Sequence, residues 1–415
     1  MTDLLERRTR LMGPHVPTFY DRPVHLVRGQ GVHLWDASGK RYLDCYNNVA
    51  HVGHCHPRVV AAIAEQSATL NTHTRYLHDG ILEYIEALTA TLNHDLSQMI
   101  MVCTGSEAND IALRMAQAVT GKIGIIATDN TYHGNTLATS HLSTRRPPIG
   151  GYPDHVVLVP APLSDTTPEA FGTHVSHAIQ TLEDRGHGFG GMMLCPIFAN
   201  EGFPQVSKGF FDPAAKAIKA AGGLILCDEV QPGFGRIGSH FWGHEWLGIA
   251  PDVVTVGKPM ANGYPVAGTI ARPDVMAAFR EAFGYFNTFG GNPVAAAAAL
   301  ETLRVIQDEE LQENAAKVGA HALERLQGIT HAGAVEARGY GLFFGIEFQH
   351  DDGTPATDYC AAVVEKMVQG GVLMNRIGRH MNTLKMRPPM PFERQHADQA
   401  IDLLEQVLKD TPWNG

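Results

Sequence analysis

The segment GGLILCDEVQPGFGR (residues 222–236) decides the fold, because its apolar run 224–227 ends directly in Asp228 and Glu229. A strand that is buried on both faces is an unbroken apolar run, which is typical of parallel sheets. A carboxylate at the end of such a strand is costly unless it is paired with a cation. The segment therefore predicts an α/β fold with a binding site at the carboxyl end of a strand.

Six other segments have the same short apolar character, and most are separated by stretches compatible with helices, such as 108–119 and 213–221. The six apolar runs are residues 99–102, 123–127, 156–159, 192–195, 253–256 and 266–270. Alternation of buried strands with helices predicts a large, doubly wound α/β domain around a mostly parallel, seven-stranded sheet.

Three parts of the chain are expected from these patterns. Residues 1–57 form an N-terminal arm with part of a small sheet, and residues 58–293 form the large domain. Residues 294–415 form a smaller α+β domain that begins with an alanine-rich helix at 295–308. Its further elements are a strand near 342–348 and helices at 357–369 and 396–408.

Composition and charge exclude several classes of protein. The chain has 415 residues, of which 44% are hydrophobic, and a net charge of −11, which argues against a nucleic-acid partner. No apolar run reaches the ~18 residues of a membrane span, and MTDLLERRTR lacks the apolar core of a signal peptide. We therefore expect a cytoplasmic protein. The six scattered cysteines favour structural roles over a disulfide framework.

Side chains that could bind a ligand or take part in catalysis follow the ends of several strands. Gly105 and Ser106 open a helix after the run 99–102, where free N–H groups suit a phosphate, although Ser and Thr also cap many ordinary helices. Tyr132 precedes His133 and Gly134 after another run, and its ring could stack on a flat ligand or simply pack.

Asp228 and Lys258 complete the pattern. Asp228 could hold a pyridinium N–H or a metal, but no His or Cys lies at ligand spacing around it. Lys258 stands between Gly257 and Pro259, where a lowered pKa would allow imine formation with a carbonyl ligand. Together these residues match the needs of pyridoxal 5′-phosphate (PLP): an anchor for its phosphate, an aromatic ring that stacks on its ring, an acid for its ring nitrogen and a lysine that forms an imine with its aldehyde.

Five motifs occur in the order that is found in one family: GSEAND (105–110), TYHG (131–134), DEVQPGFGR (228–236), VGKPMANGYP (256–265) and FNTFGGNP (286–293). Over nearly its whole length the sequence resembles the class III aminotransferases, which are PLP-dependent transferases of fold type I. The resemblance implies that fold and a PLP cofactor.

The resemblance also implies the role of each cofactor-binding residue. Lys258 would form the Schiff base with PLP, and Asp228 would pair with the ring nitrogen. Thr288 would contact the phosphate bound by a partner subunit, which implies an obligate homodimer with shared active sites. The remaining cofactor-binding residues implied are Gly105 and Ser106 at the phosphate, Tyr132, His133 and Val230 at the ring, and Gln231 near its hydroxyl.

Three segments, 47–57, 70–79 and 384–389, look like the ethanolamine-phosphate and phosphohydroxylysine phospho-lyase branch of the family. Many ω-aminotransferases have an Arg where Lys385 stands, and a Glu paired with it where Cys195 stands. Lys is a weaker partner than Arg for a carboxylate but a good one for phosphate. The histidines and Cys55 within 51–56 lack a second ligand pair, so we do not interpret them as a metal site.

The leading hypothesis is therefore a phospho-lyase that acts on a small phosphorylated amine such as O-phosphoethanolamine. Arg75 is the first candidate for the substrate phosphate and Lys385 the second; Tyr20, Arg146 and Arg387 are weaker. The alternatives are an ω-transaminase that uses pyruvate or 2-oxoglutarate, a lyase acting on an aminophosphonate, and a non-enzymatic regulator or scaffold. The last would require a lost lysine or an added DNA-binding domain, and neither is seen.

Overall fold

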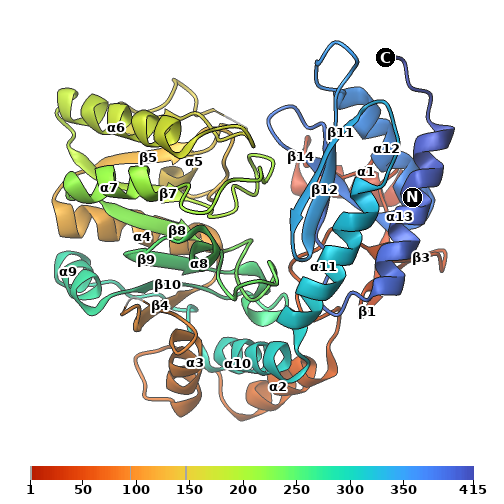
Figure 1. Ribbon diagram of the computed structural model, residues 1–415. Coiled ribbons are helices and arrows are strands. Elements are labelled where there is room, and N and C mark those ends of the chain that lie inside the picture. The colour runs from red at the N-terminus through yellow and green to blue at the C-terminus, as the bar shows by residue number, and fades with distance from the viewer. Residues whose placement is uncertain (1, 94, 145–146) are drawn as a thin grey trace.

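A seven-stranded sheet lies at the centre of the larger part of the molecule in the computed structural model, which describes residues 2–93, 95–144 and 147–415 (Figure 1). Its order is β4-β10-β9-β8-β7-β5-β6. The strands are β4 (Gln98–Val102), β5 (Gly124–Thr128), β6 (Val156–Val159), β7 (Phe189–Leu194), β8 (Leu224–Asp228), β9 (Val253–Val256) and β10 (Ala267–Ala271). The neighbouring strands β6, β5, β7, β8 and β9 are parallel, whereas β10 runs antiparallel to both of its neighbours. The predicted seven-stranded, mostly parallel sheet is confirmed.

Helices cover both faces of this sheet, which explains the unbroken apolar runs. On one face, Ile125 and Ala127 pack with α4 (Gly105–Thr120) and α9 (Pro273–Phe283). On the other face, Ile126 packs with α6 (Pro168–Asp184) and α7 (Asp212–Ala220). Successive residues of a strand point to opposite faces, so a strand between two helical layers must be apolar throughout.

A second sheet, β11-β12-β15-β14, lies in the C-terminal part of the chain and is antiparallel. Its strands are β11 (Ala334–Tyr340), β12 (Phe343–Phe348), β14 (Asn375–Ile377) and β15 (Thr383–Met386). Helices α11 (Leu311–Gln327) and α12 (Thr357–Gln369) pack against this sheet, and α13 (Arg394–Asp410) packs on both helices, in the cyan and blue part of Figure 1.

A third sheet joins the two ends of the sequence. The N-terminal strands β1 (Leu26–Gln30), β2 (His33–Asp36) and β3 (Arg41–Asp44) are extended by β13 (Val372–Leu373), which pairs with β3 in parallel. The other helices are α1 (Thr2–Met12), α2 (Pro57–Thr69), α3 (Asp79–Thr89), α5 (Leu137–Ser140), α8 (Gly243–Leu247), the short 3₁₀ helix η1 (Lys258–Ala261) and α10 (Pro293–Asp308). Helix α10, which lies beside α2 and α3, confirms the predicted alanine-rich helix. The domain boundaries stay a prediction. Within the described residues, no helix is both long enough and apolar enough to cross a membrane.

Candidate active site

The ends of β4, β5, β7, β8 and β9 meet around a cavity of about 150 Å³. Because parallel strands present their carboxyl ends at one edge of the sheet, residues far apart in sequence converge there. The cavity is lined by Gly105, Ser106, Asn109, Tyr132, His133, Gly134, Cys195, Asp228, Val230, Gln231 and Lys258. All the residues predicted to bind the cofactor therefore lie together, except Thr288.

The N-terminus of α4 forms one wall of the cavity. Thr104 caps the helix in a reciprocal capping box with Glu107, so the backbone of Gly105 and Ser106 is held in place. Ser106 Oγ accepts a hydrogen bond from Asn135 N at 3.0 Å. Gly134 has φ +140°, and a Cβ atom there would lie 2.6 Å from Ser106 Oγ. Gly134 thus lies directly against Ser106 at the N-terminus of α4. The backbone N–H groups of a helix N-terminus are suited to binding an anion.

Asp228 ends β8 and is held by three hydrogen bonds. Its Oδ2 accepts from His133 Nδ1 at 2.7 Å and from Asn109 Nδ2 at 2.9 Å, and its Oδ1 accepts from Val230 N at 3.0 Å. Burial alone would raise the pKa of Asp228, but the hydrogen bond and charge of His133, together with the charge of Lys258, lower it below its usual value. The cavity therefore contains a fixed negative charge.

Lys258 follows β9 at the start of η1, and its amine shares the cavity with Asp228. Burial lowers the pKa of Lys258, the charge of Asp228 opposes this shift, and the charge of Arg387 adds to it. The backbone of Lys258 has φ +32°, a value that non-glycine residues rarely adopt and that occurs mostly at functional sites. The arrangement favours a lysine amine that can accept a proton or attack a carbonyl.

Two basic side chains lie next to the ring of Tyr46, and one of them, Arg387, reaches Gln231 in the wall of the cavity. Lys385 Nζ is 5.5 Å and the Arg387 guanidinium 5.0 Å from the centre of this ring. Arg387 donates hydrogen bonds to Gln231 Oε1 and to Tyr46 O, and both basic residues are more than nine-tenths buried. Lys385 and Arg387 are two residues apart at the end of β15, so alternation places them on the same side of the strand.

Asn109 and Cys195 line the cavity but were not among the predicted cofactor-binding residues. Asn109 Nδ2 donates to both Asp228 and the carbonyl of His133, and Asn109 Oδ1 accepts from Thr255 Oγ1 at 2.5 Å. Its position four residues after Gly105, one turn into α4, is the signal that could have identified it. Burial raises the pKa of the Cys195 thiol, so this group is neutral where many relatives were expected to carry a carboxylate.

The predicted substrate residues Arg75, Lys385 and Tyr20 do not line this cavity. Arg75 is exposed, lies 3.7 Å above the ring of Phe286 and lines a different cavity of about 490 Å³. Thr288 is also exposed, and its predicted contact with the phosphate bound by a partner subunit stays a prediction, as does the predicted substrate contact of Arg75. Tyr20 is buried and donates to Met374 O at 3.1 Å. Arg146 lies outside the described residues.

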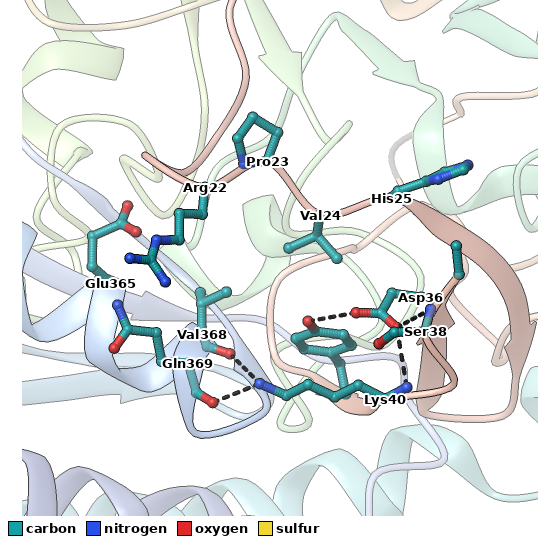
Figure 2. Close-up of a pocket in the computed structure, with 12 residues that line it drawn as sticks. Arg22, Pro23, Val24, His25, Asp36, Ser38, Lys40, Glu365, Val368 and Gln369 are labelled. Atoms are coloured by element: carbon teal, nitrogen blue, oxygen red, sulfur yellow. Dashed lines mark hydrogen bonds between the residues drawn. The ribbon is translucent and has the colours of Figure 1, made fainter. Parts of the chain in front are cut away.

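A further hollow lies between the N-terminal segment and α12, and Figure 2 shows hydrogen bonds from Lys40 and around Asp36 on its wall. Lys40 Nζ donates to Val368 O and Gln369 O at the end of α12, and Tyr42 OH donates to Asp36 at 3.0 Å. This hollow is about 490 Å³, larger than the cavity at Lys258, and the two share no lining residue. Chemistry rather than size therefore identifies the site.

The histidines of the segment 51–56 have separate partners. His51 Nε2 contacts Phe234 O, His54 pairs with Asp44 at 2.6 Å, and His56 pairs with Glu309. Among the residues that the structure describes, no group of three or more His, Cys, Asp or Glu side chains could hold a metal ion.

Comparison with known proteins gives a consistent result across sequence and structure. The family model for class III aminotransferases matches residues 17–408. An alanine–glyoxylate aminotransferase 2-like protein of Drosophila melanogaster is 37% identical, with 96% of this chain and 85% of that protein covered. The ethanolamine-phosphate phospho-lyase homolog 1 of Caenorhabditis elegans is 34% identical, with 98% of this chain and 93% of that protein covered.

Among solved structures, a phospholyase from Arthrobacter in complex with phosphoethanolamine superposes with a TM-score of 0.96. It is 40% identical to this chain, and the match covers 99% of this chain and 100% of the other.

Proposed function

Because the chain belongs to the class III aminotransferases, we propose that it is a phospho-lyase that eliminates phosphate from a small phosphorylated amine such as O-phosphoethanolamine. The observation that carries the proposal is the pair of buried basic side chains, Lys385 and Arg387, which share the ring of Tyr46, with the charge of Arg387 acting on the lysine of the cavity. The similarity to a phosphoethanolamine-bound phospholyase supports the same substrate class.

The donor set of the cavity fits PLP, the cofactor on which the family depends. The N-terminus of α4 offers backbone N–H groups and the Ser106 hydroxyl to a phosphate. Asp228 Oδ1 accepts only one hydrogen bond from the described residues, so this carboxylate oxygen retains capacity for a ring N–H. Lys258 supplies the amine for the aldehyde.

We assign the binding roles accordingly. Gly105 and Ser106 would hold the phosphate, Tyr132 and Val230 would flank the ring, and Asp228 would keep its nitrogen protonated. The bound cofactor supplies an electron-withdrawing ring that accepts electron density when a neighbouring carbon loses a proton. His133 and Asn109 orient Asp228 for this role.

Lys385 and Arg387 would hold the substrate's phosphate group. A phosphate carries close to two negative charges near neutral pH, and two cations desolvated by burial are well suited to it. Arg387 already contacts neutral oxygens of Gln231 and Tyr46, which fix the direction of its guanidinium. A nearby anion would also reduce the repulsion between Arg387 and protonated Lys258.

The elimination assigns a separate task to each of these groups. Lys258, whose lowered pKa favours the neutral amine, takes the proton from the carbon that bears the substrate's nitrogen. The bond between the next carbon and the phosphate oxygen breaks, and the phosphate leaves with the electron pair while Lys385 and Arg387 stabilise its charge. The remaining enamine reacts with water to give an aldehyde and ammonia.

A phosphate-release assay tests the proposal. The PLP-loaded protein is given O-phosphoethanolamine without any oxo acid, and inorganic phosphate is followed. Release at catalytic rates with equal amounts of acetaldehyde and ammonia is expected. Absence of release, together with transfer of the amino group to pyruvate or 2-oxoglutarate, would replace the proposal with transamination.

Substitution of the cations tests the anion site. Arg387→Ala and Lys385→Ala should each raise KM for O-phosphoethanolamine by roughly 10- to 100-fold, because each removes a hydrogen bond between charged groups. Lys216→Ala, at an exposed position of α7, is the matched control and should leave KM unchanged. A KM that does not change in the first two variants would remove both residues from the substrate site.

Transamination of an amine or ω-amino acid is the second candidate, favoured by the 37% identity to an alanine–glyoxylate aminotransferase 2-like protein. A transaminase must bind an oxo acid by its carboxylate, for which Arg387, whose charge acts on Lys258, is the candidate guanidinium. Under this alternative, the wild-type enzyme would release no phosphate from O-phosphoethanolamine. Arg387→Ala would instead weaken the binding of 2-oxoglutarate.

A homodimer with shared sites is part of the proposal. The loops that carry Arg75 and Thr288 also expose large apolar side chains, with Leu77 100% and Phe289 72% exposed. Contiguous exposed apolar surface is typical of protein–protein interfaces. We propose that a second copy of the chain covers this surface, so that Arg75 and Thr288 reach the partner's cavity. We also propose that the enzyme is cytoplasmic.

A further inference from the structure

Arg236 is a buried cation that is held by neutral groups. It ends the motif at residues 228–236, and its side chain is fully buried. Its Nη1 donates to the carbonyl oxygens of Leu342 at 3.0 Å and Pro388 at 2.8 Å. Among the described residues, no acidic side chain forms an ion pair with it. Burial of a charge is costly, so an arginine in such a place is expected to hold a particular geometry.

His51 lies on the other side of this guanidinium. Arg236 Nη2 donates to His51 Nδ1 at 3.1 Å, and His51 Nε2 lies 2.8 Å from Phe234 O. A guanidinium can only donate and a carbonyl can only accept, so these neighbours fix one tautomer, in which Nε2 carries the proton and Nδ1 accepts. His51 is therefore neutral. Burial and the charge of Arg236 act in the same direction, because both lower the pKa of His51 well below its usual value.

The carbonyl that Arg236 holds belongs to the residue after Arg387. On the other side, the backbone N–H of Arg387 donates to Cys45 O at 2.8 Å. The side chain of Arg387 donates to Tyr46 O and to Gln231 Oε1 in the wall of the cavity. The backbone of Arg387 is thus held on both sides while its guanidinium is directed at the cavity, and Arg236 supplies one of the two backbone contacts.

The segment that carries His51 is also tied to the loop of the cavity lysine. His51 O accepts from Met390 N at 2.7 Å, which holds the chain beyond Arg387. Asn262, in the loop that follows the lysine, accepts from Val52 N at 3.0 Å and donates to the carbonyl of the next residue at 2.8 Å. This segment therefore connects the loop of the cavity lysine with the chain that bears Arg387.

We propose that Arg236 and His51 are positioning residues for the substrate anion: His51 sets the direction of the Arg236 guanidinium, which in turn fixes the backbone from which Arg387 reaches the cavity. The inference rests on the proposed function in that Arg387 binds the anionic group of the substrate, whether phosphate or the carboxylate of an oxo acid. It also gives a role to a histidine of the segment 47–57, which the cofactor site does not use.

The charge of Arg236 acts at the same place. Burial and the charge of Arg387 lower the pKa of Arg236 to about 9, and the charge of Asp44 opposes this shift. Arg236 is therefore still charged at neutral pH, and the two buried guanidinium groups repel each other. An anion bound by Arg387 would reduce this repulsion. A substitution that keeps the charge at Arg236 is needed to isolate the effect of its geometry.

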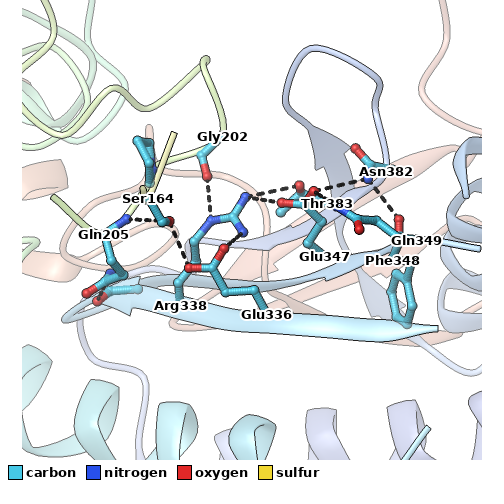
Figure 3. A network of polar contacts seen from close by, with 12 residues as sticks. Ser164, Gly202, Gln205, Glu336, Arg338, Glu347, Phe348, Gln349, Asn382 and Thr383 are labelled. Atoms are coloured by element: carbon cyan, nitrogen blue, oxygen red, sulfur yellow. Dashed lines mark hydrogen bonds and ion pairs between the residues drawn. The ribbon is translucent and has the colours of Figure 1, made fainter. Parts of the chain in front are cut away.

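A second buried arginine provides a matched structural control. Figure 3 shows the guanidinium of Arg338, on β11, between Glu336 at 2.7 Å and Glu347 at 2.6 Å. It also donates to Thr383 Oγ1 at 3.4 Å, at the start of β15, the opposite end of the strand from the one that leads to Arg387. Replacement of Arg338 by lysine should therefore cost stability without changing the direction of Arg387.

The test measures KM of the PLP-loaded protein for O-phosphoethanolamine. Arg236→Lys keeps the charge but loses the planar fork, so KM should rise by roughly 3- to 30-fold. The visible absorbance of the lysine-bound cofactor should stay that of the wild type. Arg338→Lys should lower the thermal stability to a similar extent and leave KM unchanged. If no phosphate is released, KM for 2-oxoglutarate in transamination gives the same readout.

Two substitutions of His51 form an independent pair. His51→Asn and His51→Leu both lose the N–H that donates to Phe234 O, but asparagine keeps an oxygen near the place of Nδ1 that can accept from Arg236. KM should rise in His51→Leu by about as much as in Arg236→Lys, and by at most about twofold in His51→Asn. Circular dichroism and thermal unfolding establish that each variant is folded.

Arg387→Ala, measured in parallel, separates this inference from the proposed function. A raised KM in Arg387→Ala with a wild-type KM in Arg236→Lys and His51→Leu would overturn the positioning roles alone. An unchanged KM in Arg387→Ala would overturn the anion site and the positioning roles with it. An equal rise of KM in Arg338→Lys, or equal KM values in the two His51 variants, would show general destabilisation and reject the inference.

Discussion

At the scale of the residue, the site depends on two groups with opposite preferences for charge. Burial disfavours the charged forms of both Asp228 and Lys258, but the donors around Asp228 reverse the effect for the carboxylate. The carboxylate is therefore kept ionised while the amine is shifted toward neutrality. A fixed anion for a ring nitrogen and an amine that can accept protons are what a PLP site requires.

Asp228→Asn should lower kcat/KM by about 10²- to 10³-fold, because the neutral amide cannot hold a protonated ring nitrogen. In the wild type the pKa is depressed, so the charge is present above the usual value of about 3.9 and is lost only as the pH falls through the lower folded value. Steady-state kinetics from pH 5 to 8 measure the effect. Asp165→Asn, at an exposed aspartate, is the control. Activity of Asp228→Asn equal to that of the control would contradict the assignment.

Lys258→Ala should remove both the visible absorbance of the lysine-bound cofactor and the elimination, since no other amine lines the cavity among the described residues. Spectra of purified protein with added PLP measure the first effect independently of activity. The exposed-lysine variant Lys216→Ala should keep the wild-type spectrum. Persistence of the band in Lys258→Ala would show that a different amine binds the cofactor.

The sequence was sufficient to place Asp228 and Lys258 at one edge of the sheet, because Asp228 ends one apolar run and Lys258 follows another after a single glycine. Their roles toward PLP stay predictions. The sequence was insufficient for the substrate anchors, since many basic residues follow strands or loops and their convergence depends on tertiary packing. The sequence therefore ranked Arg75 ahead of Lys385 and Arg387, whose spacing of two along β15 was the available signal for a shared side of the strand, and the roles of all three stay predictions.

At the scale of the element, apolar runs identified all seven strands of the large sheet, but a run of apolar residues has no direction. The antiparallel placement of β10 was therefore not predicted. The two-residue strand β13 and the separate strands β11, β14 and β15 were also not foreseen, because short or half-buried strands have weak patterns. Helix α12 was predicted with the bounds that the structure has, since its apolar spacing is regular and Gly370 ends it.

The turn after β5 offers a test at this scale. Gly134→Ala should weaken PLP binding, because its Cβ would lie 2.6 Å from Ser106 Oγ and displace the wall at the N-terminus of α4. Gly121→Ala is the matched control, since Gly121 also has a positive φ but open space around it. Both should lose about 1–3 kcal/mol of stability, but only Gly134→Ala should have a higher Kd for PLP in a fluorescence titration. Equal affinity in the two variants would contradict the role of the turn.

At the scale of the whole molecule, the proposed dimer makes each active site the product of two chains. Arg75 and Thr288 lie outside the cavity of their own chain, yet they belong to segments with exposed apolar side chains. A single sequence does not reveal which residues act across an interface. Arg75 was therefore predicted as the first candidate for the substrate phosphate without any indication of which subunit's cavity it serves.

Mixed dimers test this sharing. Chains with Lys258→Ala and chains with Arg75→Ala are co-expressed with different tags, and the mixed species is purified. If Arg75 acts across the interface, one of the two sites has both wild-type residues, and phosphate release with the wild-type KM should reappear at about half the wild-type rate per dimer. If Arg75 acts within its own chain, the mixed dimer should show only the raised KM of Arg75→Ala.

The parallel pairing of β13 with β3 has a consequence for biosynthesis. Strand β3 ends at Asp44, but its partner begins at Val372, roughly 330 residues later. At typical elongation rates of about 5–20 residues per second, the ribosome needs about 15 to 65 s to produce the missing strand. The large sheet, whose seven strands all lie between those two points, is complete first. We therefore expect the edge of β3 that faces β13 to wait without its partner on the nascent chain, while β1, β2 and β3 can pair with one another. An exposed strand edge of this kind is a site at which a chaperone would act during translation.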